Sequence, residues 1–264
     1  MYDMWLEQVA DLGQVPGPEV FWMARFGEWL PLHIYMAIVR GEGRNILINC
    51  GPPLDYLPRM NEVWREELGE RSHMTVAPDQ QIEAVLQRHQ LTVNDIDMVI
   101  VTPLQAYALG NIDKFPRAEI VISRTGWEDL LAPPFYDPRR HMAVPDRLLQ
   151  YFLFQAWHEK RIRLVGAEET VAPGVRTVWL GTHHRSSLGI FVDTPRGVVA
   201  FTDTVFYYEN LEQDHPLGIQ ESMMECRLAY HRLRKEADLV VSAYDPKNQV
   251  RFPGGVVAVG GKGR

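Results

Sequence analysis

The segment Met98-Val99-Ile100-Val101 constrains the fold more than any other part of the sequence, because every side chain in it is apolar. A strand on a half-exposed sheet alternates apolar and polar residues, whereas a strand covered on both faces reads as a continuous apolar run. A helical pattern over residues 79–91 precedes this segment, with Ile82, Val85 and Leu86 at helical spacing. We therefore expect a sheet with helices packed against it.

Similar signals divide the chain into two strand-rich halves, each with its own helices. Strands are expected at residues 34–39, 45–49, 98–101, 119–123, 175–180, 188–193, 198–202 and 239–243. Helices are expected at 79–91, 126–131 and 222–236, and Ser222 and Glu225 have the spacing of a capping box at the start of the last one. This order predicts an α/β (α+β) fold, a four-layer αββα sandwich of two sheets covered outside by helices.

The length and composition suit one domain over residues 1–264. A chain of 264 residues with 46% hydrophobic content can bury a substantial core. Residues 1–30 are rich in aromatics, Pro and Gly without a clear period, which predicts an irregular N-terminal arm. Residues 134–164 begin with proline-containing loops and continue into an aromatic amphipathic stretch, which predicts a lid or docking insertion. The Gly-rich residues 254–264 are expected to form a flexible tail.

Charge and cysteine content narrow the function classes. The net charge of −7 argues against nucleic acid as a partner, because phosphate binding relies on clustered Lys and Arg. The first residues carry acids where a signal peptide needs bases, and no apolar run is long enough to span a bilayer. Cys50 and Cys226 make no disulfide framework and suit a reducing compartment. We expect a cytoplasmic protein with no membrane partner.

Several short segments occur in a specific order and spacing. They are Ile46–Gly51, Asp95–Thr102 followed by Gly110-Asn111, Gly181–His183, Phe201–Asp203 and Ser242–Pro246. Together they resemble the metallo-β-lactamase superfamily, in particular its branch of N-acyl homoserine lactonase-like hydrolases. The resemblance implies the αββα fold of that family and a small substrate such as a lactone, an ester or an activated ether.

The metal-binding motifs of that family are degenerate in this chain. The family loop reads Thr-His-x-His-x-Asp-His-x-Gly-Asn, and further ligands come from later segments. The corresponding positions here hold Pro103, Gln105, Tyr107, Ala108, His183, Asp203 and Tyr244. Only His183 and Asp203 keep a good donor, and a catalytic zinc usually needs three protein ligands. The resemblance thus implies the scaffold without its metal cage. We expect no metal cofactor, although one zinc or other divalent ion at the remaining donors stays compatible with the sequence.

Two interpretations are open for His183 and Asp203. They are either a general-base pair that activates water, or a buried hydrogen-bonded pair that fills the former metal site. The neighbouring His184 is expected to face the other way. A rebuilt metal site would need His141, His158 or His215 beside the pair. Tyr107 and Tyr244, with Gln105, either contact a substrate oxygen or plug the cavity.

Aromatic residues gather in two segments. One is the stretch 151–157, and the other is the N-terminal arm with Trp5, Phe21, Trp22 and Trp29. Core packing and a protein interface explain these aromatics equally well, because aromatic side chains dominate both settings.

Three hypotheses of function follow. The first is a subunit without a metal centre, which assembles with a metal-bearing paralogue, or with copies of itself, in a hydrolase and shapes the substrate entrance. The second is a metal-free or single-metal hydrolase that uses His183 and Asp203. The third is a module that binds a small ligand without turning it over.

Overall fold

The chain forms strands and helices along most of its length, and the computed structural model describes residues 1–133 and 144–260. The strands are β1 (Asp3–Pro16), β2 (Trp29–Gly41), β3 (Arg44–Ile48), β4 (Ser72–Thr75), β5 (Met98–Ile100), β6 (Glu119–Ser123), β7 (Ile162–Val165), β8 (Glu168–Ala172), β9 (Val175–Trp179), β10 (Leu188–Thr194), β11 (Gly197–Thr202), β12 (Leu239–Ser242) and β13 (Val256–Ala258). The helices are α1 (Gly17–Val20), α2 (Leu57–Leu68), α3 (Ile82–Arg88), α4 (Ala106–Leu109), α5 (Arg124–Leu131), α6 (Asp146–Tyr151), α7 (Tyr208–Glu212), α8 (Met223–Glu236) and α9 (Asn248–Arg251).

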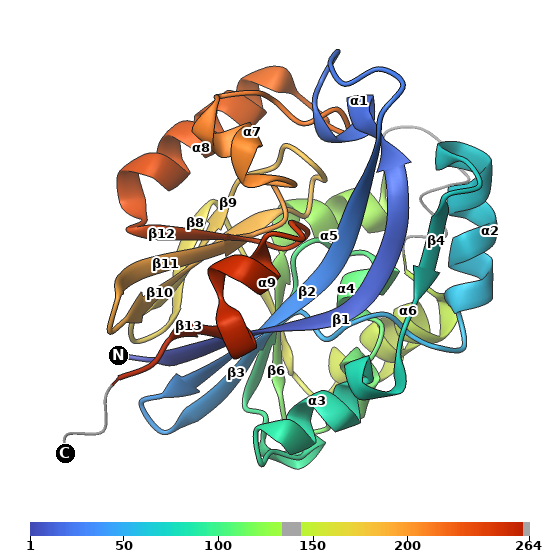
Figure 1. Cartoon of the computed structure of the whole chain (residues 1–264). Coiled ribbons are helices and arrows are strands. Elements are labelled where there is room, and N and C mark those ends of the chain that lie inside the picture. The colour runs from blue at the N-terminus through green and yellow to red at the C-terminus, as the bar shows by residue number, and fades with distance from the viewer. Residues whose placement is uncertain (134–143, 261–264) are drawn as a thin grey trace.

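Two β-sheets lie at the centre of the molecule, and helices cover them outside (Figure 1). The 8-stranded sheet has the order β13-β1-β2-β3-β5-β6-β7, with β4 paired to β1. The 5-stranded sheet has the order β12-β11-β10-β9-β8. Figure 1 shows α8 on the outer side of the smaller sheet, while α2, α3 and α6 lie on the far side of the larger one. The predicted four-layer αββα arrangement is confirmed.

Strand β5 has the environment that its apolar sequence predicts. It pairs in parallel with β3 on one side and with β6 on the other. Met98 is 1% exposed, and Val99 and Ile100 are fully buried. Because this strand is covered on both faces and paired at both edges, the loop that follows it starts from a rigid position.

The N-terminal segment differs from the irregular arm expected from the sequence. Residues 3–16 form the long strand β1, which pairs with β2 along its whole length, rather than an irregular arm. The register shifts between Gln8 and Ala10, and again between Asp11 and Gly13. Each irregularity reverses the inward and outward alternation of side chains, so the period of a strand is lost in the sequence.

The expected lid (134–164) and the expected tail (254–264) also contain regular structure. Residues 134–143 of the expected lid lie outside the described residues, but the segment continues through α6 and a π-helical turn (Phe152–Ala156) into β7, a strand of the larger sheet. In the expected C-terminal tail, β13 pairs with β1, while residues 261–264 are not described. Both segments are thus tied to the sheet by backbone hydrogen bonds that join residues far apart in the sequence.

The aromatic residues divide between core and surface. Phe152 is fully buried, whereas Phe154 is 73% exposed and Trp157 is 48% exposed. Trp157 stacks on Trp127 of α5, with ring centroids 6.4 Å apart. In the N-terminal segment Phe21 is buried and Trp22 is 43% exposed. The core interpretation therefore holds for some of these aromatics, and exposed contact surface remains for others.

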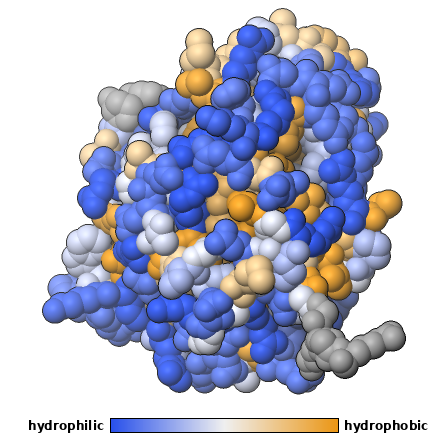
Figure 2. Space-filling model, turned by 90° about the vertical axis from the view of Figure 1, so that its left-hand side faces the viewer, coloured by the Kyte–Doolittle hydropathy of each residue, from blue (hydrophilic) through white to orange (hydrophobic). Residues whose placement is uncertain are grey.

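Neither a disulfide nor a helix able to span a bilayer occurs in the described parts of the chain. Cys50 and Cys226 are both free and buried. None of the described helices is long and apolar enough to cross a bilayer. Seen from the side that lies on the left in Figure 1, the surface is mainly hydrophilic, with hydrophobic residues interspersed (Figure 2).

Candidate active site

The candidate site lies where the ends of strands from both sheets meet. Helix α4 follows β5 and carries Tyr107, and the loop between β9 and β10 carries His183. Asp203 comes directly after β11, and Tyr244 comes after β12. Because β11 and β12 are parallel neighbours, their carboxyl ends lie side by side and bring Asp203 and Tyr244 to the same edge.

The structure brings His183 and Asp203 together. The His183 Nδ1 atom is 3.2 Å from the Asp203 Oδ2 atom. Asp203 is fully buried, and His183 is 7% exposed. A carboxylate at this distance orients the imidazole and stabilises the imidazolium that forms when the ring takes up a proton. The pair therefore has the geometry of a general base with its orienting acid.

Asp203 is held by hydroxyl groups from two other segments. Thr102 Oγ1 donates to Asp203 Oδ1 at 2.5 Å, and Ser187 Oγ donates to Oδ2 at 2.5 Å. Thr102 is anchored in turn by Asn49, which accepts from the Thr102 backbone N–H and donates to its carbonyl, both at 2.8 Å. This buried network connects the ends of β3, β5 and β11 behind His183.

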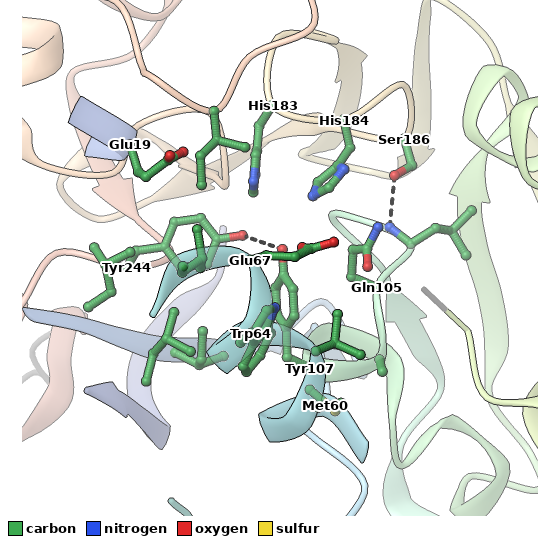
Figure 3. Close-up of a pocket in the computed structure, with 18 of the residues that line it drawn as sticks. Glu19, Met60, Trp64, Glu67, Gln105, Tyr107, His183, His184, Ser186 and Tyr244 are labelled. Carbon is green, nitrogen blue, oxygen red and sulfur yellow. Dashed lines mark hydrogen bonds between the residues drawn. The ribbon is translucent and has the colours of Figure 1, made fainter. Parts of the chain in front are cut away.

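Aromatic rings surround His183 on the cavity side. The ring of Phe206 meets it edge-on at 4.7 Å between centroids, and the ring of Tyr244 does so at 5.8 Å. The ring of His184 lies 4.0 Å away, and Figure 3 shows both imidazoles pointing into the cavity. The expectation that His184 faces the other way is therefore wrong. The two residues lie in a loop rather than on a strand, and Thr182 before them has a positive φ of 71°.

Tyr107 and Tyr244 meet across the cavity. Their hydroxyl oxygens are 3.1 Å apart (Figure 3). Burial raises the pKa of the Tyr244 hydroxyl well above its ordinary value, and the nearby Tyr107 and Asp203 raise it further. Burial likewise raises the pKa of the Tyr107 hydroxyl. Both groups thus keep their protons at neutral pH. One hydroxyl proton joins the two oxygens, and the other is available to a ligand.

The cavity in front of these residues has a volume of about 740 Å³. Part of its wall is apolar, with Leu12 and Val15 of β1, Leu32 and Ile34 of β2, and Met60, Val63, Trp64 and Leu68 of α2. The rest carries polar and charged side chains, among them Arg59, Asp129, Arg185 and Glu221. A cavity of this size, lined by both apolar and polar groups, is large enough for a small molecule. Glu19 and Glu67 also line it, and burial together with the charge of Glu67 raises the pKa of Glu19.

The remaining degenerate positions offer zinc no strong ligand. Pro103 and Ala108 are buried and carry no side-chain donor. Gln105 lines the cavity with a neutral amide, and the hydroxyls of Tyr107 and Tyr244 bond to each other. In residues 1–133 and 144–260, no three or more His, Cys, Asp or Glu side chains are grouped so as to hold a metal ion. The residues present do not fit a dizinc centre.

The histidines considered for a rebuilt metal site do not join the pair in the described part of the chain. His158 is exposed beyond the π-helical turn, and the His215 ring contacts the Trp22 carbonyl at 3.0 Å. His141 lies outside the described residues. Gln105, Tyr107 and Tyr244 line the cavity without filling it.

Sequence reasoning missed three contributions to the site. It assigned no role to α2, whose Met60, Trp64 and Leu68 recur at a spacing of four residues and face the cavity. That spacing is the signal that a periodicity search detects. It also missed Thr102 and Ser187, because a single Thr or Ser in a sequence carries no sign of its hydrogen-bond partner.

Comparisons with known proteins bear on the fold of the chain. No protein-family model matches the sequence, and no curated protein sequence matches it. Solved structures do match its shape. An AiiA variant from B. thuringiensis with N-decanoyl-L-homoserine bound at the active site has a TM-score of 0.74, 18% identity, and coverage of 94% of this chain and 95% of that chain.

Two further structures resemble the chain over nearly its full length. AidC, a dizinc quorum-quenching lactonase, has a TM-score of 0.65 and 13% identity, covering 99% of this chain and 92% of that chain. AbOPH, a hydrolase in the beta-lactamase superfamily, has a TM-score of 0.64 and 12% identity, covering 97% and 90%. The chain has the metallo-β-lactamase fold.

The cavity of this chain lies at the strand ends, where Tyr107, His183 and Tyr244 line it. At identities of 18% and below, the likeness concerns the fold alone. The chemistry of this chain depends on its own side chains, which pair one histidine with one aspartate beside two tyrosine hydroxyls.

Proposed function

We propose that this chain hydrolyses a small lactone, ester or similarly activated substrate in its cavity without a dizinc centre. The observation that carries this proposal is the contact of 3.2 Å between His183 Nδ1 and the buried Asp203 Oδ2 beside the cavity. Asp203 orients the His183 ring, and the opposite nitrogen of the ring accepts a proton from water. General-base catalysis of this kind typically contributes ~10²–10⁴ in rate.

His183 and one tyrosine hydroxyl carry the proton transfers of the proposed hydrolysis. The water oxygen attacks the carbonyl carbon while His183 Nε2 takes the water proton. The tyrosine hydroxyl that keeps a free proton donates to the carbonyl oxygen as negative charge develops there. The bond from the carbonyl carbon to the leaving oxygen then breaks, and His183 returns its proton to that oxygen. The products are a carboxylic acid and an alcohol, which remain one molecule if the substrate is a lactone.

The test is hydrolysis of a panel of lactones and aryl esters by chelator-treated protein. The variant His183→Gln should lower kcat/KM by about 10²–10⁴, the range for loss of a general base. His158→Gln is the matched control, because His158 is exposed and does not line the cavity. Unchanged turnover in His183→Gln would contradict the proposal. A ligand that raises the melting temperature without product would instead favour a non-catalytic binding module.

We also propose the partner role, since an exposed apolar loop supports it. Trp22, Met23 and Phe26, between α1 and β2, are 43%, 65% and 68% exposed. Clustered exposed apolar side chains of this kind are typical of contact surfaces. Here the chain would assemble with a metal-bearing paralogue, or with copies of itself, and shape the substrate entrance.

Co-expression with the product of the neighbouring gene tests the partner role. We expect a stable complex with higher hydrolytic activity than the lone chain. A Trp22→Ser, Phe26→Ser variant should lose the complex, whereas a matched pair of changes at exposed Met224 and Leu228 of α8 should keep it. Full hydrolytic activity of the chain alone, together with no increase in its molecular size after co-expression, would rule the partner out.

A further inference from the structure

The hydroxyl groups beside Asp203 each have a defined hydrogen-bond direction. Ser187 Oγ accepts from the His184 backbone N–H at 3.0 Å, and Thr102 Oγ1 accepts from the Leu188 backbone N–H at 2.8 Å. A backbone N–H can only donate, so each hydroxyl must direct its own single proton elsewhere.

Asp203 is the acceptor closest to both hydroxyl oxygens. Ser187 Oγ and Thr102 Oγ1 are each 2.5 Å from one of its carboxylate oxygens. The other acceptor near Thr102 Oγ1 is the Leu188 carbonyl, at the longer distance of 3.2 Å. Short contacts of this kind are typical of a hydroxyl that donates to an ionised carboxylate.

We infer that Thr102 and Ser187 are positioning residues that set the tautomer of His183. Thr102 donates to Asp203 Oδ1 and Ser187 donates to Oδ2, so both carboxylate oxygens act as acceptors. The contact from His183 Nδ1 to Asp203 Oδ2 therefore has Nδ1–H as the donor. A neutral imidazole carries one N–H, so Nε2 is left with a lone pair. The catalytic meaning of this arrangement rests on the proposed hydrolase function, but the tautomer itself does not.

The position of Nε2 makes this tautomer useful for proton transfer. Asp203 does not line the cavity, whereas His183 does. The ring therefore places Nδ1 toward the buried network and its other nitrogen toward the space beside Phe206 and Tyr244 (Figure 3). A water or substrate in the cavity meets an acceptor, as a general base requires. The reverse tautomer would present an N–H and could not take a proton.

The tautomer can be measured without any substrate. Protein labelled with ¹⁵N-histidine is studied by long-range ¹H–¹⁵N NMR correlation at about pH 8, where an ordinary imidazole is neutral. His183→Gln identifies the His183 signals. We expect the Nδ1–H tautomer, with the Nδ1 proton shifted downfield by its hydrogen bond. An Nε2–H tautomer in the wild-type protein would overturn the inference.

Variants then test the two hydroxyls. Ser187→Ala and Thr102→Val should each reduce the Nδ1–H population or remove its downfield proton signal, and Ser187→Thr and Thr102→Ser should restore it. The matched control is Thr177→Val, because Thr177 is equally buried and its hydroxyl donates to the Glu169 carbonyl instead. Unchanged His183 signals in both hydroxyl-free variants would show that Thr102 and Ser187 do not set the tautomer.

Kinetics separate this inference from the proposed function. If the chain is a hydrolase, Ser187→Ala should lower kcat by about tenfold to a hundredfold with little change in KM, since only the orientation of the base is lost. If the chain turns out to lack hydrolase activity, the NMR result still decides the tautomer. An active enzyme whose His183 carries its proton on Nε2 would keep the function and refute the positioning role.

Discussion

The hydroxyl oxygens of Tyr107 and Tyr244 lie 3.1 Å apart, although 137 positions separate the two residues in the sequence. One tyrosine follows a strand of the larger sheet, and the other follows a strand of the smaller sheet. Their contact joins the two halves of the chain across the cavity, at positions where the resemblance to lactonases implies metal ligands. This pair and the His183–Asp203 pair are the groups that would donate and accept protons in the proposed hydrolysis.

Removal of the tyrosine hydroxyls should affect both stability and activity. Tyr107→Phe or Tyr244→Phe breaks the hydrogen bond between them and should lower the free energy of unfolding by about 1 kcal/mol. The double variant also loses the proton donor for the carbonyl oxygen, so kcat should fall by ~10²–10³. Thermal unfolding and steady-state kinetics measure these effects. Tyr151→Phe is the control, because Tyr151 bonds Arg161 and does not line the cavity. Unchanged kcat in the double variant would exclude the hydroxyls from catalysis.

Zinc binding should be weak in the wild-type chain and should return when its donors are restored. We expect little zinc after gel filtration, and no change in melting temperature on addition of a chelator. The variant Pro103→His, Gln105→His, Tyr107→Asp, Ala108→His, Tyr244→His supplies good donors at every degenerate position and should retain zinc. Elemental analysis measures the difference. The control is the double variant Pro103→Ala, Ala108→Ser, which adds no strong ligand. Stoichiometric zinc in the wild-type protein would contradict the prediction.

Tyr2→Phe should stabilise the protein. The Tyr2 hydroxyl is buried and has no hydrogen-bond partner in the described parts of the chain. Burial raises the pKa of this hydroxyl, and the charge of Glu42 raises it further, so the group stays protonated and polar. Removal of a buried polar atom without a partner should raise the free energy of unfolding by about 1–3 kcal/mol. Chemical denaturation measures the change, and Tyr208→Phe should do the opposite because that hydroxyl donates to Asn248. Equal loss of stability in both variants would refute the argument.

Glu7 should make stability depend on pH in the acidic range. Burial alone would raise its pKa, but hydrogen bonds from His89 at 2.6 Å and Arg88 at 2.5 Å outweigh it and lower the pKa below the ordinary 4.5. A carboxyl with a lowered pKa stabilises the folded state above its unfolded pKa, and this contribution is lost as pH falls through the folded pKa. The wild-type protein should therefore lose stability as pH falls below 4.5.

The comparison variant for this pH effect is Glu7→Gln. It should be less stable than the wild type at neutral pH, and it should lose less stability as pH falls below 4.5. Denaturation at a series of pH values measures both slopes. Glu66→Gln is the control, since Glu66 is exposed and has no ion pair within the described residues. A slope in Glu7→Gln equal to that of the wild type would assign the acid sensitivity to other carboxyls.

Local chemistry was enough to predict much of the architecture. The apolar run at Met98–Ile100 predicted a strand covered on both faces, because a sheet position with water on one side would need polar residues. The start of α8 could also be predicted, and Ser222 Oγ accepts from the Glu225 backbone N–H at 3.3 Å. Both signals act over a few residues, so neighbours in the sequence are sufficient to reveal them.

Long-range packing set what these local patterns could not. Strand β1 carries bulges that break its period, so its pairing with β2 depends on the whole sheet. The orientation of His184 depends on a loop with Thr182 at positive φ. The contact from Thr102 to Asp203 spans 101 positions. A hydroxyl has no preference for a partner until the folded chain places an acceptor within reach. His183, Asp203 and the two tyrosines could thus be named from the sequence, while their arrangement and the hydroxyl donors Thr102 and Ser187 required the packed sheets.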